Sequence, residues 1–289
     1  MSITQTFTPT RPIWCAGCGD FGVKGALEKA LDSLHIPRHE LLLVTGIGCS
    51  GTIQNNVRCF GYHALHGRAL PTALGAKLAN PGLTVVVLGG DGDGFAIGAG
   101  HLVHTLKRNL GITYIVMNNG TYGLTKGQPS PTSATGYRNN VEEELDPILL
   151  GLSLPGSTFL ARGFSGRPEQ LDRLTTAAIE HSRSGKGMAF LEVLSPCVTY
   201  NDTYGLWRSR LHDVDEDAHY DPHDRALAFK ATLELREKGR LPVGLLFEAQ
   251  HASLESLVLS SEQAPPALQG IDPRDHLEAY YDVMRSFVG

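Results

Sequence analysis

The sequence predicts an α/β protein built on a doubly wound, mostly parallel sheet. Three short apolar runs, at residues 41–45, 83–88 and 112–117, lack the alternation of a half-exposed strand, as is typical of strands buried on both faces. Each run leads into a glycine-rich loop, at residues 46–51, 89–94 and 118–123. Because ligands of open α/β sheets bind outside the carboxyl ends of the strands, we expect these loops to converge on one ligand.

Helix-favouring segments separate the predicted strands, as βαβ units require. The predicted helices are residues 19–34, 69–79, 95–106 and 168–183, and two further strands are predicted at residues 158–161 and 188–194. The last of these helices begins with a proline, which is tolerated at the first helical position. This alternation predicts one domain over residues 1–205. Residues 206–289 are expected to form a C-terminal extension that packs on the same domain or on a partner subunit.

Composition excludes several classes of protein. The 289 residues carry 25 Lys and Arg against 30 Asp and Glu, so the chain lacks the basic excess of a nucleic-acid-binding protein. The longest apolar runs fall far short of the ~20 residues that span a bilayer, and the N-terminus shows no secretory signal pattern. We therefore expect a cytoplasmic protein with no nucleic-acid or membrane partner. Five cysteines in such a protein favour metal or redox chemistry over disulfides.

Two polar motifs follow neighbouring predicted strands. Gly90-Asp91-Gly92 ends one strand and Asn118-Asn119 ends the next. Carboxylate, amide and carbonyl oxygens are the hard ligands that Mg²⁺ prefers, and flanking glycines let backbone amides approach a phosphate group. The alternative is a strand–turn–helix in which the aspartate only caps the helix. The pair of motifs resembles the thiamine diphosphate-binding motif.

That resemblance implies a function for each motif residue. Asp91 and Asn119 would be side-chain ligands of Mg²⁺, and the carbonyl of Thr121 would be the third ligand. The residues expected to line the diphosphate are Gly92, Asp93, Gly123 and Leu124.

The cysteines form a second constellation. Cys15 and Cys18 lie in WCAGCGD just before a predicted helix, whereas Cys49 and Cys197 lie at strand ends, in GIGCSG and LSPCVTY. Four thiolates can hold either a zinc ion or a [4Fe–4S] cluster, and CxxC is also compatible with a redox pair. Spacing does not choose between Cys49 and Cys59 as the third ligand, although the glycine-flanked loop favours Cys49.

A family resemblance joins the two constellations. The segments that carry it are WCAGCGDFGVKGAL, TGIGCSG, YHALHGRALPTALGAKLANP, VVLGGDGDGFAIGAGHL, MNNGTYGLTKGQPSPTS and SPCVTYN. Over residues 11–205 the chain resembles the β subunit of 2-oxoacid:ferredoxin oxidoreductases, and most of all the 2-oxoglutarate type (2-oxoglutarate synthase) of two-subunit enzymes. The resemblance implies a thiamine diphosphate-binding fold that holds thiamine diphosphate, Mg²⁺ and one [4Fe–4S] cluster. The implied cluster ligands are Cys15, Cys18, Cys49 and Cys197, which leaves Cys59 free.

The implied reaction is the oxidative decarboxylation of 2-oxoglutarate to succinyl-CoA and CO₂. Coenzyme A is the co-substrate, and electrons pass through the cluster to ferredoxin. The reaction could also run in reverse as a carboxylation. In this interpretation the loop of Ile47, Gly48, Cys49 and Ser50 contacts the thiamine ring.

Other candidate residues lie near these motifs. The resemblance implies that His66 lies near the phosphates with Arg68 beside it. Lys126 follows the predicted Mg²⁺ loop and would contact the substrate carboxylate or a phosphate, the alternative being a solvated loop lysine. We therefore take His66 and Lys126 as the candidate catalytic residues. His63 and His66 would share a face of a helical turn, with His63 as an ordinary packed histidine.

The chain lacks a convincing glutamate for the thiamine aminopyrimidine ring. A separate α subunit is expected to supply that glutamate and much of the substrate pocket in an α₂β₂ heterotetramer, so this chain alone should be inactive. The rival interpretations are a pyruvate-specific or broad-specificity enzyme of the same family, a non-redox thiamine diphosphate decarboxylase or carboligase with structural zinc, and a cofactor-free scaffold.

Overall fold

A single mixed sheet organises the chain. The computed structural model describes residues 7, 10–259, 264–270, 274 and 277–287, and within them an eight-stranded sheet has the order β2-β1-β3-β4-β6-β5-β8-β7. The strands are β1 (Leu41–Thr45), β2 (Phe60–His63), β3 (Thr84–Gly90), β4 (Thr113–Asn118), β5 (Phe159–Phe164), β6 (Ala189–Leu194), β7 (Leu211–Asp213) and β8 (Leu241–Glu248). Neighbouring strands are parallel except β5 and β8, which are antiparallel.

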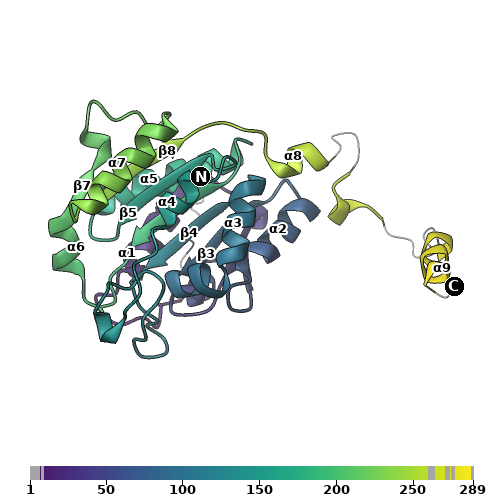
Figure 1. Cartoon of the computed structure of the whole chain (residues 1–289). Helices are drawn as coiled ribbons and strands as arrows, with labels where there is room; N and C mark the ends of the chain where they lie inside the picture. The colour runs from purple at the N-terminus through teal and green to yellow at the C-terminus, as the bar shows by residue number, and fades with distance from the viewer. Residues whose placement is uncertain (1–6, 8–9, 260–263, 271–273, 275–276, 288–289) are drawn as a thin grey trace, which may run out of the picture.

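Helices cover both faces of the sheet (Figure 1). One face carries α1 (Asp20–Ser33) and α5 (Pro168–Arg183), which pack against each other. The other face carries α2 (Ala69–Ala79), α3 (Ala99–Arg108), α4 (Pro147–Leu152) and α7 (Arg225–Glu237). The remaining α-helices of the described chain are α6 (Tyr204–Arg210), α8 (Leu254–Val258) and α9 (Leu277–Ser286). Figure 1 shows α9 standing apart from the other helices. The predicted doubly wound, mostly parallel α/β fold is confirmed.

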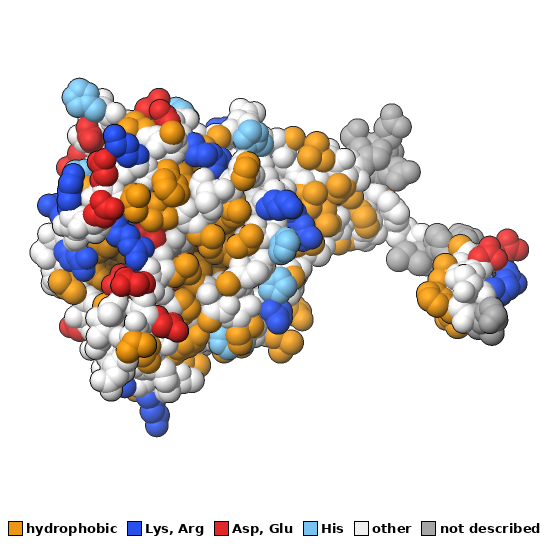
Figure 2. Space-filling model, viewed as in Figure 1, with side chains coloured by type: hydrophobic (Ala, Val, Ile, Leu, Met, Phe, Trp, Pro, Cys, Tyr) orange, Lys and Arg blue, Asp and Glu red, His pale blue; other side chains and the backbone are white. Residues whose placement is uncertain are grey.

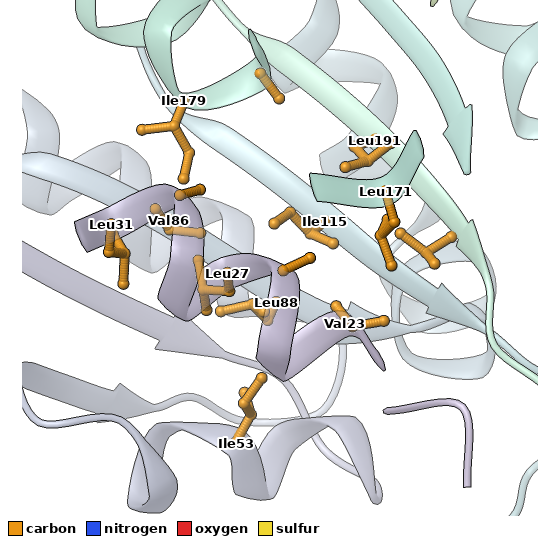
Figure 3. Close-up of a cluster of buried hydrophobic side chains, with 14 of the residues drawn as sticks. Val23, Leu27, Leu31, Ile53, Val86, Leu88, Ile115, Leu171, Ile179 and Leu191 are labelled. Carbon is orange, nitrogen blue, oxygen red and sulfur yellow. The ribbon is translucent and has the colours of Figure 1, made fainter. Parts of the chain in front are cut away.

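The core explains why these segments fold as they do. Val23, Leu27 and Leu31 recur at helical spacing in α1, and all three are fully buried. Figure 3 shows them facing Val86 and Leu88 of β3. Successive strand residues point to opposite faces, and helices cover both faces of β3. The strand is therefore apolar on both sides, which is why its sequence shows no polar alternation.

Two local predictions need correction. The predicted helix at 95–106 is interrupted, because a π-helical turn over Asp93–Ile97 ends at Gly98 before α3 begins. Residues 60–68 do not form a helical turn, because His63 ends β2 and His66 lies in the turn before α2.

The C-terminal part of the chain extends the same sheet. The sequence indicated no strands after residue 200, yet β8 pairs with β5 and β7 pairs with β8. The domain boundary at residue 205 stays a prediction. No helix in the described part of the chain is long and apolar enough to cross a membrane.

Candidate functional site

The loops that follow β1, β3 and β4 enclose a cavity of about 110 Å³, here called the central cleft. The three strands pair in parallel register, so the loops leave the sheet at one edge. The lining of the cleft includes the predicted cofactor and magnesium residues Ile47, Gly48, Cys49, Ser50, His66, Asp91, Gly92, Asp93, Asn119, Thr121, Gly123 and Leu124. The structure thus brings together residues that are up to 77 positions apart in the sequence.

Asp91 is the buried carboxylate of this cleft. Its Oδ2 accepts hydrogen bonds from Ser130 Oγ at 2.5 Å and Thr132 Oγ1 at 2.7 Å. The other oxygen, Oδ1, has only a long contact of 3.5 Å to the backbone nitrogen of Asn119. Burial raises the pKa of Asp91, although these hydrogen bonds oppose the shift. A buried carboxylate beside the Asn119 amide oxygen and Thr121 fits a Mg²⁺ ion.

Asp93, two residues further on, has a different task. Its carboxylate is buried, and Oδ1 accepts hydrogen bonds from the backbone amides of Ile47 at 2.9 Å and Gly67 at 2.8 Å. His66 Nδ1 lies 2.9 Å from the same oxygen. Because a carboxylate accepts, Nδ1 carries the proton, which leaves Nε2 as the unprotonated ring nitrogen of neutral His66. Asp93 therefore joins three loops that line the central cleft.

Glycines keep the cleft open for a phosphate group. A Cβ at Gly92 would lie 2.3 Å from the Tyr122 ring, so only glycine fits beneath that ring. Gly48 has a φ of +123°, a backbone conformation that residues other than glycine rarely adopt. Backbone amides that no side chain shields are the usual cradle for a diphosphate.

A second cavity, of about 230 Å³, is lined by Cys15, Cys18, Cys49 and Cys197 and is here called the cysteine cavity. Cys59 is not among its lining residues; its Sγ lies 3.3 Å from the Phe60 carbonyl. Among the described side chains, no group of three or more His, Cys, Asp or Glu could hold a single metal ion. Four cysteines around one cavity fit a [4Fe–4S] cluster, in which each thiolate binds a separate iron.

Contacts that the sequence did not reveal hold the cysteine segments in place. Trp14 Nε1 donates to the Cys49 carbonyl at 2.8 Å, which joins the N-terminal segment to the loop after β1. Ser195 Oγ donates to Asp20 Oδ1 at 2.7 Å, and a Cβ at Gly19 would lie 2.6 Å from that hydroxyl. The only sequence signal for this close approach was the glycine after Cys18.

The thiols are unfavourable sites for negative charge unless a cation joins them. Burial, the Asp20 carboxylate and the neighbouring thiols Cys197 and Cys15 raise the pKa of Cys49 to about 11. Burial and Asp20 also raise the pKa of Cys18. Bound iron would lower the pKa of these thiols, because a coordinated thiol is deprotonated.

The central cleft and the cysteine cavity share a wall. Cys49, Asn119, Gly123 and Leu124 line both cavities. The Asn201 side chain also donates to the Asn119 carbonyl at 2.9 Å, which ties the segment after Cys197 to the loop after β4. A group in one cavity would therefore be next to a group in the other.

A buried ionic network supports the loop after β4. Asn118 Nδ2 donates to Glu192 Oε1 at 2.7 Å, and Arg162 Nε donates to Glu192 Oε2 at 2.6 Å. Arg162 Nη2 also lies 2.9 Å from Asp146 Oδ1. Burial opposes the charge on Arg162, but the two carboxylates hold its pKa above the usual range. The Asn118 amide oxygen accepts from the Gly120 backbone at 3.0 Å, so the network extends into the loop.

Two predicted residues lie outside the central cleft. Arg68 is exposed, is absent from the cleft lining, and donates to His101 Nε2 at 2.9 Å. Lys126 is exposed on the loop just beyond Leu124, with a φ of +80°. The Arg68 side chain thus turns toward α3, and its expected proximity to the phosphates stays a prediction.

Family models match most of the described fold. Residues 46–193 match the model described as "Thiamine pyrophosphate enzyme, C-terminal TPP binding domain". Residues 197–261 match a model of the C-terminal part of the pyruvate ferredoxin oxidoreductase beta subunit. The fold and the first match define a thiamine diphosphate-binding protein.

Individual relatives indicate which family of thiamine diphosphate-binding proteins the chain resembles. The chain is 41% identical over 283 residues to the 2-oxoacid:ferredoxin oxidoreductase subunit beta of Saccharolobus solfataricus, with 92% of this chain and 90% of the relative covered. It is 37% identical to the 2-oxoglutarate synthase subunit KorB of Methanocaldococcus jannaschii, with 68% of this chain and 73% of the relative covered.

A solved structure agrees with these relatives. A chain of the 2-oxoglutarate:ferredoxin oxidoreductase from Magnetococcus marinus, with 2-oxoglutarate, coenzyme A and succinyl-CoA bound, matches with a TM-score of 0.80 and 37% identity, covering 87% of this chain and 86% of that one. The chain therefore belongs to the family of 2-oxoacid:ferredoxin oxidoreductase β subunits.

Asp93→Ala should destabilise the three loops that this carboxylate joins. The change leaves the buried backbone amide of Gly67 and the partly buried amide of Ile47 without their acceptor, so the free energy of unfolding should fall by about 3 kcal/mol. Urea denaturation of the apoprotein measures the effect. Asp32→Ala, at an exposed position of α1, is the matched control and should change stability by less than about 0.5 kcal/mol. Equal effects of the two substitutions would contradict the role given to Asp93.

Glu192→Gln should weaken the support of the loop after β4. Removing one carboxylate of a buried ion pair costs about 3–5 kcal/mol, because Arg162 keeps its charge. Unfolding by urea gives the stability, and Mg²⁺ titration of the folded variant should show weaker binding. Glu234→Gln removes only an exposed ion pair with Lys230 and should cost under about 0.5 kcal/mol. Unchanged stability of Glu192→Gln would contradict the stabilising role given to the buried ionic network.

Proposed function

We propose that this chain is the β subunit of a CoA-dependent enzyme that oxidatively decarboxylates 2-oxoglutarate to succinyl-CoA and CO₂. In this proposal electrons leave through a [4Fe–4S] cluster to ferredoxin, and reduced ferredoxin can drive the reverse carboxylation. The observation that carries the proposal is the wall shared by the central cleft and the cysteine cavity. An organic cofactor and an electron acceptor held on its two sides would be close enough for direct electron transfer.

The chain's own residues have distinct tasks in this proposal. Bound thiamine diphosphate supplies the electron sink for decarboxylation of a 2-oxo acid. Asp91, Asn119 and Thr121 would hold Mg²⁺, and the unshielded backbone at Gly92 would contact the diphosphate. Asp93 orients His66 so that Nε2 is the ring nitrogen available to a ligand.

The cysteine cavity would hold the cluster through Cys15, Cys18, Cys49 and Cys197. Trp14 and Leu124 also line this cavity, so part of its wall is apolar. Apolar surroundings limit the access of water, which tunes the potential of such a cluster.

An exposed apolar patch supports an α subunit as the partner. Strand β2 is an edge strand with all four residues exposed, which leaves one side of it without a hydrogen-bonded neighbour in the described chain. Apolar side chains around it and the central cleft are also exposed, namely Ile47, Phe60, Tyr62, Leu65, Ile97 and Leu124. Such patches usually mark interaction sites. We propose that this patch is buried against the α subunit in an α₂β₂ assembly, and that the α subunit brings the glutamate for the cofactor.

A broader substrate range is the second candidate. The 2-oxoacid relatives match over 90% or more of this chain, whereas the KorB relatives match over 65–68% of it. We propose that the exposed Lys126 contacts the substrate carboxylate, and a lysine there does not by itself exclude pyruvate.

Activity of the assembled enzyme on two substrates decides between these candidates. With the α subunit, CoA and ferredoxin, 2-oxoglutarate should give the higher kcat/KM, and Lys126→Ala should lower that value more than it lowers the value for pyruvate. A preference of tenfold or more for pyruvate, which is about 1.4 kcal/mol of discrimination, would refute 2-oxoglutarate as the substrate. The α subunit alone is the control for background activity.

A matched pair of cysteine variants tests the cluster. Cys49→Ser removes a proposed ligand and should lower the iron bound per chain and the visible absorption of the anaerobically purified protein. Cys59→Ser changes the cysteine outside the cavity and should keep about four irons. Loss of iron in Cys59→Ser with retention in Cys49→Ser would exchange the two assignments, whereas zinc in both would favour the non-redox enzyme.

A further inference from the structure

A third cavity lies on the opposite side of the loop after β4 from the central cleft. Its volume is about 140 Å³, and its lining includes Arg162, Arg210, Arg236 and Arg240, so it is called the arginine cavity. Its lining also includes residues of β6 and of the start of β8, namely Glu192, Leu194, Leu241 and Pro242. Figure 2 shows acidic and basic side chains interspersed over the part of this face that carries α6, α7 and β7. Asn118 and Gly120 line the arginine cavity, whereas Asn119 and Thr121 line the central cleft.

The charges of this cavity do not cancel. The lining contains four arginines and three carboxylates, those of Glu144, Asp146 and Glu192, which leaves one positive charge in excess. Arg162 is neutralised by Glu192 and Asp146, and Arg236 Nη1 lies 3.7 Å from Asp146 Oδ2. Arg210 and Arg240 remain against the single carboxylate of Glu144, which gives the one excess positive charge.

Arg210 and Arg240 donate to backbone carbonyls. Arg210 Nε donates to the Gly239 carbonyl at 2.6 Å, and Arg240 donates to the carbonyls of Arg210 at 3.0 Å and Leu211 at 2.6 Å. Among the described residues, no carboxylate forms an ion pair with either guanidinium. These bonds hold both side chains in place without neutralising them, so each remains able to pair with an anion.

A hydroxyl in the same lining lacks a partner. Thr203 is 8% exposed, and its Oγ1 has no hydrogen-bond partner among the described residues. A buried hydroxyl without a partner costs free energy, so such groups normally bond to something. Thr203 also lines the arginine cavity, with Trp207 one helical turn further along the chain. An anion oxygen that reached Oγ1 from the cavity would satisfy this hydroxyl.

We propose that the arginine cavity binds a small anion with a carboxylate or phosphate group, held by Arg210, Arg240 and the Thr203 hydroxyl. The cavity of about 140 Å³ admits an ion of the size of phosphate or a short dicarboxylate. The site is separate from the central cleft. It is nevertheless connected to the proposed Mg²⁺ site. Thr132 lines the arginine cavity, and its hydroxyl forms hydrogen bonds with both Asp91 and Asn118. An anion there is placed to act as an effector of that loop.

Calorimetric titration of the assembled enzyme tests the proposal. Saturation with thiamine diphosphate and Mg²⁺ first keeps the probe anions out of the central cleft. Inorganic phosphate and malonate are then titrated separately, with chloride at equal ionic strength as the control. At least one of the two should bind saturably, and the stronger one identifies the preferred anion group.

Variants locate the binding. Arg240→Gln should weaken it about tenfold or more, because a charge-assisted hydrogen bond is lost, and Thr203→Val should weaken it without removing charge. Arg208 is exposed on α6, the helix that also carries Arg210, but it is absent from the lining of the cavity. The Arg208→Gln enzyme should therefore bind the anion as the unmodified enzyme does. No saturable binding of either anion, or equal binding by the Arg240→Gln and Arg208→Gln enzymes, would overturn the proposal.

Discussion

Strands β1, β3 and β4 run parallel and in register, so the loops that follow Thr45, Gly90 and Asn118 leave the sheet at the same edge. The lining residues that these three loops supply to the central cleft depend on this register. A shift by one residue would turn each strand's side chains to the opposite face and separate the loops. The packing of α1 and α5 on one face, and of α2 and α3 on the other, holds the register in place.

Two acidic residues at this edge perform different physical tasks. Asp91 keeps one oxygen nearly free of hydrogen bonds, as a metal ligand requires, whereas Asp93 accepts from two backbone amides and pairs with His66. One carboxylate is left for a ligand and the other holds the loops. The loop after β4 then lies between the two proposed cofactors, with Cys49 and Asn119 in the wall of both cavities.

Much of this arrangement could be predicted from the sequence, because its signals are local. The helix at residues 168–183 has the predicted bounds, and the motifs at Asp91 and Asn119 were recognisable from their positions at strand ends. The buried support of the loop could not be predicted. Arg162 and Glu192 come from different strands and meet only through the β5–β6 pairing.

Short and edge elements also escaped the sequence analysis. Strand β2 is four residues long and exposed, so it lacks the apolar run that marks a buried strand. The histidines His63 and His66 therefore suggested a helical turn that the structure does not contain. The side-chain directions of Arg68 and Lys126 depend on contacts and backbone conformation in the folded chain, which motif spacing does not report.

Metal analysis with low-temperature EPR tests the central claim most directly. The protein is purified anaerobically and reduced with dithionite before its spectrum is recorded. The account predicts about four irons for each copy of this chain and the signal of a reduced cluster. Bound zinc without an EPR signal would contradict it, because a zinc ion cannot carry electrons out of the neighbouring cleft.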